Sequence, residues 1–169
     1  MIRVHATCVS VGGAGVLLRG PSGSGKSDLA LRLVDAGARL VADDQVILTA
    51  DASLPLLTAT APRRLAGLIE VRGVGILPAP SVPSAPVRLV VDLVAATAVP
   101  RLPDADLLTL AGVPLPRVAL WPFAASAPAA LRLALAALAA GSPLVPAAFD
   151  SGFFGPDSFG PDCFEGVAA

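Results

Sequence analysis

The sequence predicts an α/β fold, because a strand, a glycine-rich loop, a helix and a further strand follow one another near its start. Residues 15–19 form an apolar, strand-like run, and 20–25 is rich in glycine. Residues 26–36 then carry regularly spaced leucines and valine with no helix breaker until Gly37. A second apolar run at 39–44 completes a unit that resembles a βαβ motif.

The other predicted elements surround this unit. A strand is expected at 4–11, followed by a glycine turn, and another at 45–49. The run at 68–76 is strand-like but broken by two glycines, which suggests a close approach of backbone. The remaining expectations are turn-rich or proline-rich connections at 52–67, 78–86 and 95–116, strands at 87–94 and 117–121, and a helix at 128–140.

Composition fits one folded domain. The 169 residues are 54% hydrophobic and 15% charged, and the net charge is −1. These values exclude an intrinsically disordered chain and give no basic surface for nucleic acid. The mean hydropathy is +0.75, yet the most apolar stretches, 89–99 and 129–140, are too short to span a membrane. We therefore expect a soluble protein with no membrane segment.

The cysteines and the N-terminus indicate the compartment. The two cysteines form no CxxC pair and stand near opposite ends, so neither a zinc site nor a disulfide framework is predicted. The N-terminus lacks the pattern of a secretory signal. A cytoplasmic location follows. We expect the folded domain at 1–145 and a tail rich in Phe, Gly and Pro at 146–169, for which docking and an unstructured terminus both stay open.

The most specific motif is a phosphate-binding loop. Residues 20–27 read GPSGSGKS and fit GxxxxGK[ST] between a predicted strand and a predicted helix, which is the context that the motif requires. Backbone N–H groups of such a loop surround a polyphosphate, the lysine reaches the β and γ oxygens, and the last hydroxyl ligates magnesium. The predicted nucleotide-binding residues are Gly20, Pro21, Ser22, Gly23, Ser24, Gly25, Lys26 and Ser27.

Acidic residues are placed where a metal or a proton acceptor would be needed. Asp43 and Asp44 end a strand at the sheet edge where α/β proteins bind ligands. One carboxylate can hold a metal and the other can accept a proton, although a turn pair at a strand end is the alternative. Asp28 lies in the first helical turn, where a structural and a metal-related role are both open. His5, the only histidine, is from the residues alone more typical of a structural side chain.

Glu70 and Arg72 stand on either side of Val71, on one face of the run at 68–76. Opposite charges are unusual in a buried strand unless they are used. A simple ion pair is the alternative.

These motifs, in this order, resemble the catalytic domain of HPr kinase/phosphorylase. The resemblance covers about residues 4–77 and joins a histidine, a GxSGxGKS loop, the ADD pair and the run EVRGVGI. It implies a phosphate-loop kinase core with a mixed sheet, similar to phosphoenolpyruvate carboxykinase. It also implies ATP with Mg²⁺ or Mn²⁺ as cofactors, phosphorylation of a serine of HPr, phosphorolysis of that phosphoserine, and a homo-oligomer, in family members a hexamer.

The resemblance implies catalytic roles for four residues. Lys26 would bind the phosphates, and Asp43 would be the base for the serine hydroxyl and the acid in the reverse direction. His5 matches the histidine near that aspartate. Arg72 matches the arginine of the EVRGVGI signature.

The resemblance also implies which residues lie at the magnesium ion. Ser27 and Asp44 would hold the magnesium, and Glu70 matches the acid of the signature. Asp28 replaces the usual glutamate and is one methylene shorter.

The sequence differs from the family pattern in three ways, and two functions other than that of the family stay open. The chain starts four residues before the histidine, as a form without the additional N-terminal domain would. Residues 123–127 read FAASA where the family has a PGRN-type loop tied to phosphorolysis, and the helical and Phe-rich ending lacks an obvious counterpart. The alternatives are a small-molecule kinase, for which only Arg63 and Arg64 offer a basic lid, and a non-catalytic nucleotide sensor.

Overall fold

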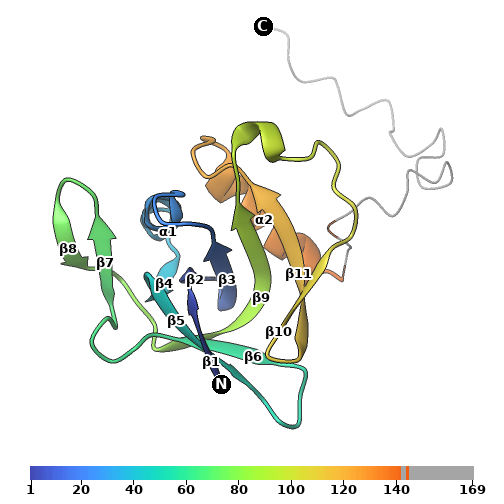
Figure 1. Ribbon diagram of the computed structural model, residues 1–169, viewed down its shortest axis with the longest axis horizontal. Coiled ribbons are helices and arrows are strands. Elements are labelled where there is room, and N and C mark those ends of the chain that lie inside the picture. Colours follow the sequence, from blue (N-terminus) through green and yellow to red (C-terminus); the bar gives the residue numbers. More distant parts are fainter. Residues whose placement is uncertain (142–143, 145–169) are drawn as a thin grey trace, which may run out of the picture.

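A mixed sheet with two helices on one face forms the body of the protein (Figure 1). The computed structural model describes residues 1–141 and 144, so the predicted tail at 146–169 lies outside the described residues. The central strands run in the order β4-β2-β3-β9-β11. Their bounds are Arg39–Ala42 for β4, Thr7–Val11 for β2, Ala14–Arg19 for β3, Ser84–Leu93 for β9 and Val113–Leu120 for β11.

Strand directions decide where a ligand can bind. The strands β3, β9 and β11 are parallel, while β2 is antiparallel to both of its neighbours, β3 and β4. The helix α1 (Lys26–Asp35) connects β3 to β4, so the predicted βαβ-like unit is present with β2 inserted between its strands. The carboxyl ends of β3, β9 and β11 therefore meet at one edge, the upper one in Figure 1.

The remaining strands extend this body. An antiparallel group joins the sheet through the first residues of β9, and β10 pairs with β11. A separate hairpin of β7 and β8 stands beside α1 in Figure 1. The bounds are Ile2–His5 for β1, Gln45–Ala50 for β5, Leu57–Thr60 for β6, Leu68–Val71 for β7, Gly75–Pro78 for β8 and Leu107–Leu110 for β10.

The sheet separates two apolar cores. One core packs the buried stripes of α1 and α2 (Ala127–Ala139) against strand residues such as Val16 and Leu18. The other core, on the opposite face, contains Leu17 and the inward side chains of β5 and β6. This alternation along β3 is the period-two pattern of a strand buried on both faces. None of the described helices has the length and apolar character needed to cross a membrane.

Several predicted boundaries were wrong. The expected strand at 4–11 is two strands, β1 and β2, that separate at Ala6. The expected connection at 52–67 contains β6, and the one at 95–116 contains the short 3-10 helix Ala96–Ala98, β10 and the start of β11. These strands are short and lie near prolines, so sheet pairing rather than local sequence determines them.

The run at 68–76 is a hairpin rather than a buried strand. Gly73 and Gly75 adopt φ of 81° and 137°, and a Cβ on either would meet no atom within 4 Å. The predicted close approach is therefore wrong, and the glycines serve the turn. Glu70 and Arg72 are both exposed, and no ion pair joins them among the residues that the structure describes.

Candidate active site

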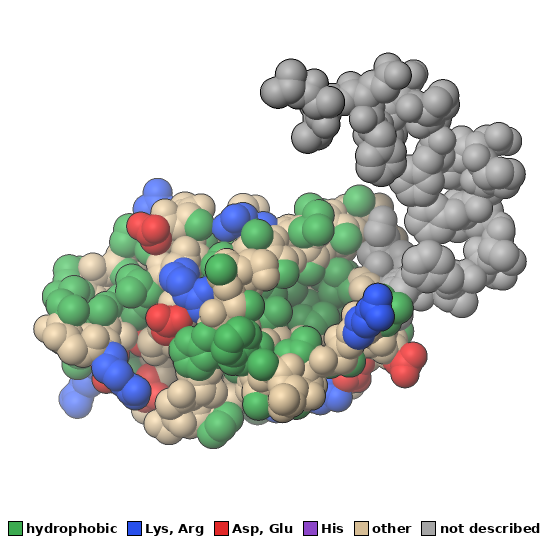
Figure 2. Space-filling view, turned by 90° about the horizontal axis from the view of Figure 1, so that it is seen from above, with side chains coloured by type: hydrophobic (Ala, Val, Ile, Leu, Met, Phe, Trp, Pro, Cys, Tyr) green, Lys and Arg blue, Asp and Glu red, His purple; other side chains and the backbone are tan. Residues whose placement is uncertain are grey.

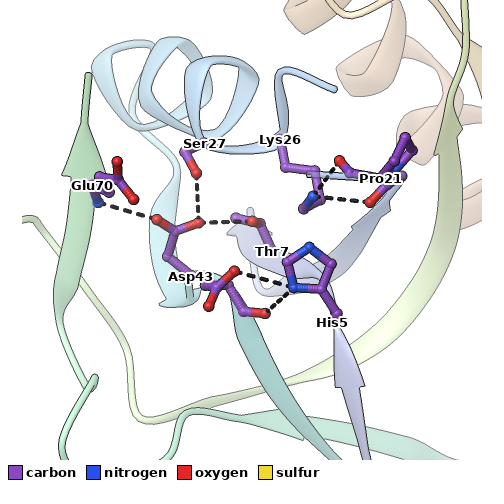
Figure 3. Close-up of polar contacts among 9 residues, drawn as sticks. His5, Thr7, Pro21, Lys26, Ser27, Asp43 and Glu70 are labelled. Atoms are coloured by element: carbon purple, nitrogen blue, oxygen red, sulfur yellow. Dashed lines mark hydrogen bonds and ion pairs between the residues drawn. The ribbon is translucent and has the colours of Figure 1, made fainter. Parts of the chain in front are cut away.

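The loop between β3 and α1 has the geometry of an anion site. Gly23 and Gly25 adopt left-handed φ of 78° and 90°, so the backbone curves around the start of the helix. Lys26 is the first helical residue. Its Nζ donates to the carbonyl oxygens of Gly20 and Pro21, both at 2.9 Å (Figure 3). The lysine charge is thus held at the loop, and the free N–H groups of the helix start lie beside it.

Lys26 is buried, with 6% of its surface exposed. Desolvation lowers its pKa below the ordinary value, and the nearby charges of Asp44 and Asp43 oppose that effect. An anionic ligand that joined these groups would stabilise the charged ammonium. A polyphosphate therefore complements the electrostatics of the loop.

Asp43 connects three elements beneath the loop. Its Oδ1 accepts hydrogen bonds from Thr7 Oγ1 at 2.7 Å and from Ser27 Oγ at 2.9 Å. Its Oδ2 accepts one from the backbone N–H of Glu70 at 3.1 Å (Figure 3). Asp43 is 5% exposed, and its three hydrogen bonds join β2, α1 and β7.

Asp44 has the opposite environment. Its side chain is 64% exposed, and its φ is 64°, a left-handed conformation that aspartate tolerates better than most residues. His5 Nδ1 lies 3.1 Å from Asp44 Oδ1 and 3.0 Å from the Asp44 carbonyl oxygen. Because both partners are acceptors, Nδ1 carries the proton. The pair is exposed to solvent and lines a cleft.

These residues surround one cleft of about 470 Å³. It brings together predicted site residues that are far apart in the sequence. Asp43 does not line it but is hydrogen-bonded to Ser27 and Glu70, which do. The lining residues are His5, Ser22, Gly23, Gly25, Lys26, Ser27, Asp28, Leu31, Asp44, Glu70, Val71, Arg72 and Phe123. Among the other predicted loop residues, Gly20, Pro21 and Ser24 do not line the cleft.

The Asp28 carboxylate forms an ion pair with Arg32, four residues further along α1. Its Oδ2 accepts hydrogen bonds from Arg32 Nη2 at 2.8 Å and Nε at 3.1 Å. Arg32 also donates to the carbonyl oxygens of Pro122 and, at 3.3 Å, Ala124. This ion pair therefore holds the segment after β11 against α1.

Sequence reasoning missed three residues around the site. Thr7 faces Asp43 only because Cys8 pairs with Ala42 across β2 and β4, a register that local sequence does not reveal. In the sequence Arg32 is typical of an exposed charge on a helix. Phe123 belongs to the FAASA segment, which differs from the loop of the family. An acid four residues before Arg32 was the one signal available for its pairing.

The residues fit a magnesium ion that shares its ligands with a phosphate. Within residues 1–141 and 144, no three His, Cys, Asp or Glu side chains are grouped as a metal cage. Ser27 Oγ and Asp43 Oδ1 lie 2.9 Å apart and offer hard oxygen donors beside the phosphate loop. Mg²⁺ is bound in this way, by one or two protein oxygens with water and substrate phosphates.

The fold and this site define an α/β domain with a phosphate-loop sequence between β3 and α1. Residues 1–97 match the HPr Serine kinase C-terminal domain family, and the chain belongs to that family. The chain is similar to proteins called HPr kinase/phosphorylase. The Limosilactobacillus reuteri relative is 40% identical over 126 residues, which are 68% of this chain and 39% of that protein. The relative from an Exiguobacterium species is 46% identical over 77 residues, 46% of this chain and 24% of the relative.

A solved structure shows the same fold. The Hpr(Ser) kinase/phosphatase from Coxiella burnetii superposes with a TM-score of 0.73 at 24% sequence identity, covering 83% of this chain and 98% of that one. The predicted α/β fold with a mixed sheet is confirmed. The chain spans only about a quarter to two fifths of the length of the first curated relatives.

Proposed function

We propose that the protein is a protein-serine kinase that transfers the γ-phosphoryl group of Mg-ATP to a seryl residue of the phosphocarrier protein HPr. The observation that carries this proposal is the cleft, in which a phosphate loop and an exposed Asp44–His5 pair face the same space. Family membership and the names of the relatives supply the substrate.

The two aspartates exchange the roles that the sequence suggested. Asp43 is buried and does not line the cleft, so a substrate hydroxyl there does not reach it, whereas its hydrogen bond from Ser27 connects it to a magnesium ion bound at that residue. Asp44 is open to the cleft. We therefore assign Asp43 and Ser27 to the magnesium ion and Asp44 to the proton.

In the proposed phosphoryl transfer, each of these groups has one role. Lys26 and the loop N–H groups hold the phosphate chain in place. The serine hydroxyl gives its proton to the Asp44 carboxylate while its oxygen bonds to the γ-phosphorus, and the bond to the ADP oxygen breaks. His5 orients Asp44 through Nδ1–H. The metal, when bound, offsets the charge that develops on the phosphate oxygens.

The hairpin supplies the remaining polar groups. Glu70 and Arg72 line the cleft opposite the phosphate loop. We assign Glu70 to the metal side through water and Arg72 to the charge of the transferred phosphoryl group. Asp28 is assigned a structural role instead of the metal role that the resemblance implied, because Arg32 occupies its carboxylate.

The test is transfer of label from γ-labelled ATP. Purified protein, Mg²⁺ and HPr should give phosphoserine on HPr, and Lys26→Ala and Asp44→Asn should abolish it. Leu133→Ala is the matched control, since Leu133 is 73% exposed on α2 and does not line the cleft. Binding of ATP without transfer to HPr would contradict the kinase proposal and favour a small-molecule kinase or a nucleotide sensor.

The reverse reaction and the assembly are measured in the same preparation. Adding inorganic phosphate to phosphorylated HPr tests phosphorolysis, for which FAASA at 123–127 replaces the expected loop. A cytoplasmic location and a homo-oligomer, a hexamer by family resemblance, belong to this proposal. Light scattering coupled to size exclusion gives the subunit number.

A further inference from the structure

The described part of the chain contains two aromatic rings of the Phe, Trp or Tyr type, and one of them, Phe123, lies beside the phosphate loop. Trp121 and Phe123 follow the carboxyl end of β11. Their ring centroids are 6.2 Å apart with an interplanar angle of 72°, an edge-to-face pair. Phe123 is 54% exposed and lines the cleft, and Trp121 is 39% exposed. One large apolar surface thus remains uncovered in the cleft, and a second one stands against it.

The Phe123 ring is in contact with the loop itself. A Cβ placed on Gly25 would lie 2.9 Å from Phe123 Cζ and 3.0 Å from Pro122 Cγ. Only glycine leaves room there for the ring. Because Gly25 precedes Lys26 and caps α1, the ring sits next to the residues that would hold the phosphates.

The segment that carries Phe123 is fixed from both sides. Arg32 donates to the carbonyl oxygens of Pro122 and Ala124, and Asp28 holds Arg32 with two hydrogen bonds. A ring on such a segment is positioned before a ligand arrives, so a ligand that covers it loses little free energy in ordering it.

A nucleotide is the ligand whose parts match this surface. Its phosphates suit the loop, and its flat base is the apolar part that would lie on a ring beside them. The ring also stands at the edge where the parallel strands end, which is where α/β proteins bind ligands. Figure 2 looks onto this end of the molecule, where hydrophobic side chains gather near the middle beside acidic and basic ones.

We propose that Phe123, supported edge-on by Trp121, is the platform on which the nucleotide base stacks. This inference rests on the proposed use of ATP and adds to it the subsite that recognises the base. Stacking does not read the edge of the base but grows stronger with the size of its face, so ATP and GTP should bind with similar affinity and both more tightly than CTP.

The test separates the base from the phosphates. Calorimetry measures the Kd of Mg-ATP and of Mg-tripolyphosphate, which lacks a base, for the wild type and for Phe123→Ala and Phe123→Leu. Both variants should raise the Kd for ATP about five-fold or more, while the Kd for tripolyphosphate stays within about two-fold of the wild-type value. Phe123→Tyr should retain wild-type affinity for ATP, and Leu133→Ala serves as the control.

Trp121, the only tryptophan, supplies an independent signal. ATP should change its emission, and tripolyphosphate should not. Equal loss of affinity for both ligands in Phe123→Leu would overturn the inference, since the ring would then only shape the loop. Unchanged ATP affinity with a raised KM for HPr would overturn it too and would assign the ring to the protein substrate.

These outcomes are distinct from failure of the proposed function, because the binding measurements need no HPr. A protein that loses ATP affinity on Phe123→Leu but never phosphorylates HPr would keep this inference and lose the kinase assignment. A wild-type chain that binds neither ATP nor tripolyphosphate would overturn both.

Discussion

Asp43 and Asp44 are adjacent in the sequence but differ in burial, in backbone conformation and in hydrogen-bond partners. Asp43 faces inward, where two hydroxyl groups and one backbone N–H group donate to it. The left-handed conformation at Asp44 turns the next side chain outward to His5 and the cleft. One change in backbone direction therefore gives two identical side chains different surroundings.

Alanine at these two positions should give different losses. Asp43→Ala leaves Thr7 and Ser27 hydroxyls and the Glu70 N–H group without their acceptor, so we expect a loss of about 3 kcal/mol in the free energy of unfolding. Asp44→Ala should lose about 1 kcal/mol, the cost of alanine in a left-handed conformation, and lower phosphoryl transfer about 100-fold or more.

Urea denaturation, with labelled transfer measured in parallel, checks this pair of variants. Asp35→Ala is the control, since Asp35 is an exposed acid at the end of α1 and does not line the cleft. Equal destabilisation by both variants, or full activity of Asp44→Ala, would contradict the assignment of the two aspartates.

The buried thiol of Cys8 should lower the free energy of unfolding at alkaline pH. Burial raises the pKa of its thiol from 9.0 to about 12. The unfolded chain therefore releases this proton above pH 9 while the folded chain keeps it, so stability is complete below pH 9 and decreases as the pH rises toward 12. Between pH 8 and pH 10 the loss attributable to Cys8 should be about 1 kcal/mol.

Comparison with Cys8→Ala isolates that contribution, because all other titrating groups are shared by the two proteins. Urea denaturation gives the free energy of unfolding of both proteins at both pH values. The wild-type value relative to that of Cys8→Ala should be lower at pH 10 than at pH 8. A stability difference independent of pH would show that the thiol ionises normally in the folded protein.

Among the elements, the hairpin of β2 and β3 depends most directly on local chemistry. Val11 pairs with Ala14, so the loop has two residues, Gly12 and Gly13, with φ of 57° and 88°. A Cβ on either would meet nothing within 4 Å, so the cost of substitution is conformational alone. Gly12→Asn should be tolerated, since Asn-Gly favours this turn, whereas Gly12→Val should destabilise the protein by about 1–2 kcal/mol. Thermal unfolding of the two variants measures the difference, and equal Tm values would contradict it.

The elements also show what the sequence could predict. The helices were expected at 26–36 and 128–140 and lie at Lys26–Asp35 and Ala127–Ala139, because capping glycines and proline act locally. The strands β6 and β10 were missed because four-residue segments near prolines acquire strand structure only by pairing. The loop at 20–27 and both aspartates are predicted as site residues from motifs. Which aspartate is buried depended on contacts from β2 and β7, which lie outside any local pattern.

For the whole molecule, the site lies where several separate parts of the chain meet. The cleft takes residues from β1, the phosphate loop, α1, the end of β4, β7 and the segment after β11. The sheet that carries them has an apolar core on each face. A ligand in the cleft therefore contacts parts of the chain that are far apart in sequence, and its binding free energy should stabilise the fold as one unit.

Mg-ATP should raise the Tm in a single transition. At a concentration 100 times its Kd, the ligand should add about 2.7 kcal/mol to stability, which for a domain of this size corresponds to about 5–10 °C. Lys26→Ala should abolish the shift relative to its own ligand-free Tm, because the phosphate chain loses its buried cation. Scanning calorimetry with Mg²⁺ alone is the control. A split transition would mean that the two cores unfold separately, and an undiminished shift in Lys26→Ala would show that ATP stabilises the protein from a site other than the phosphate loop.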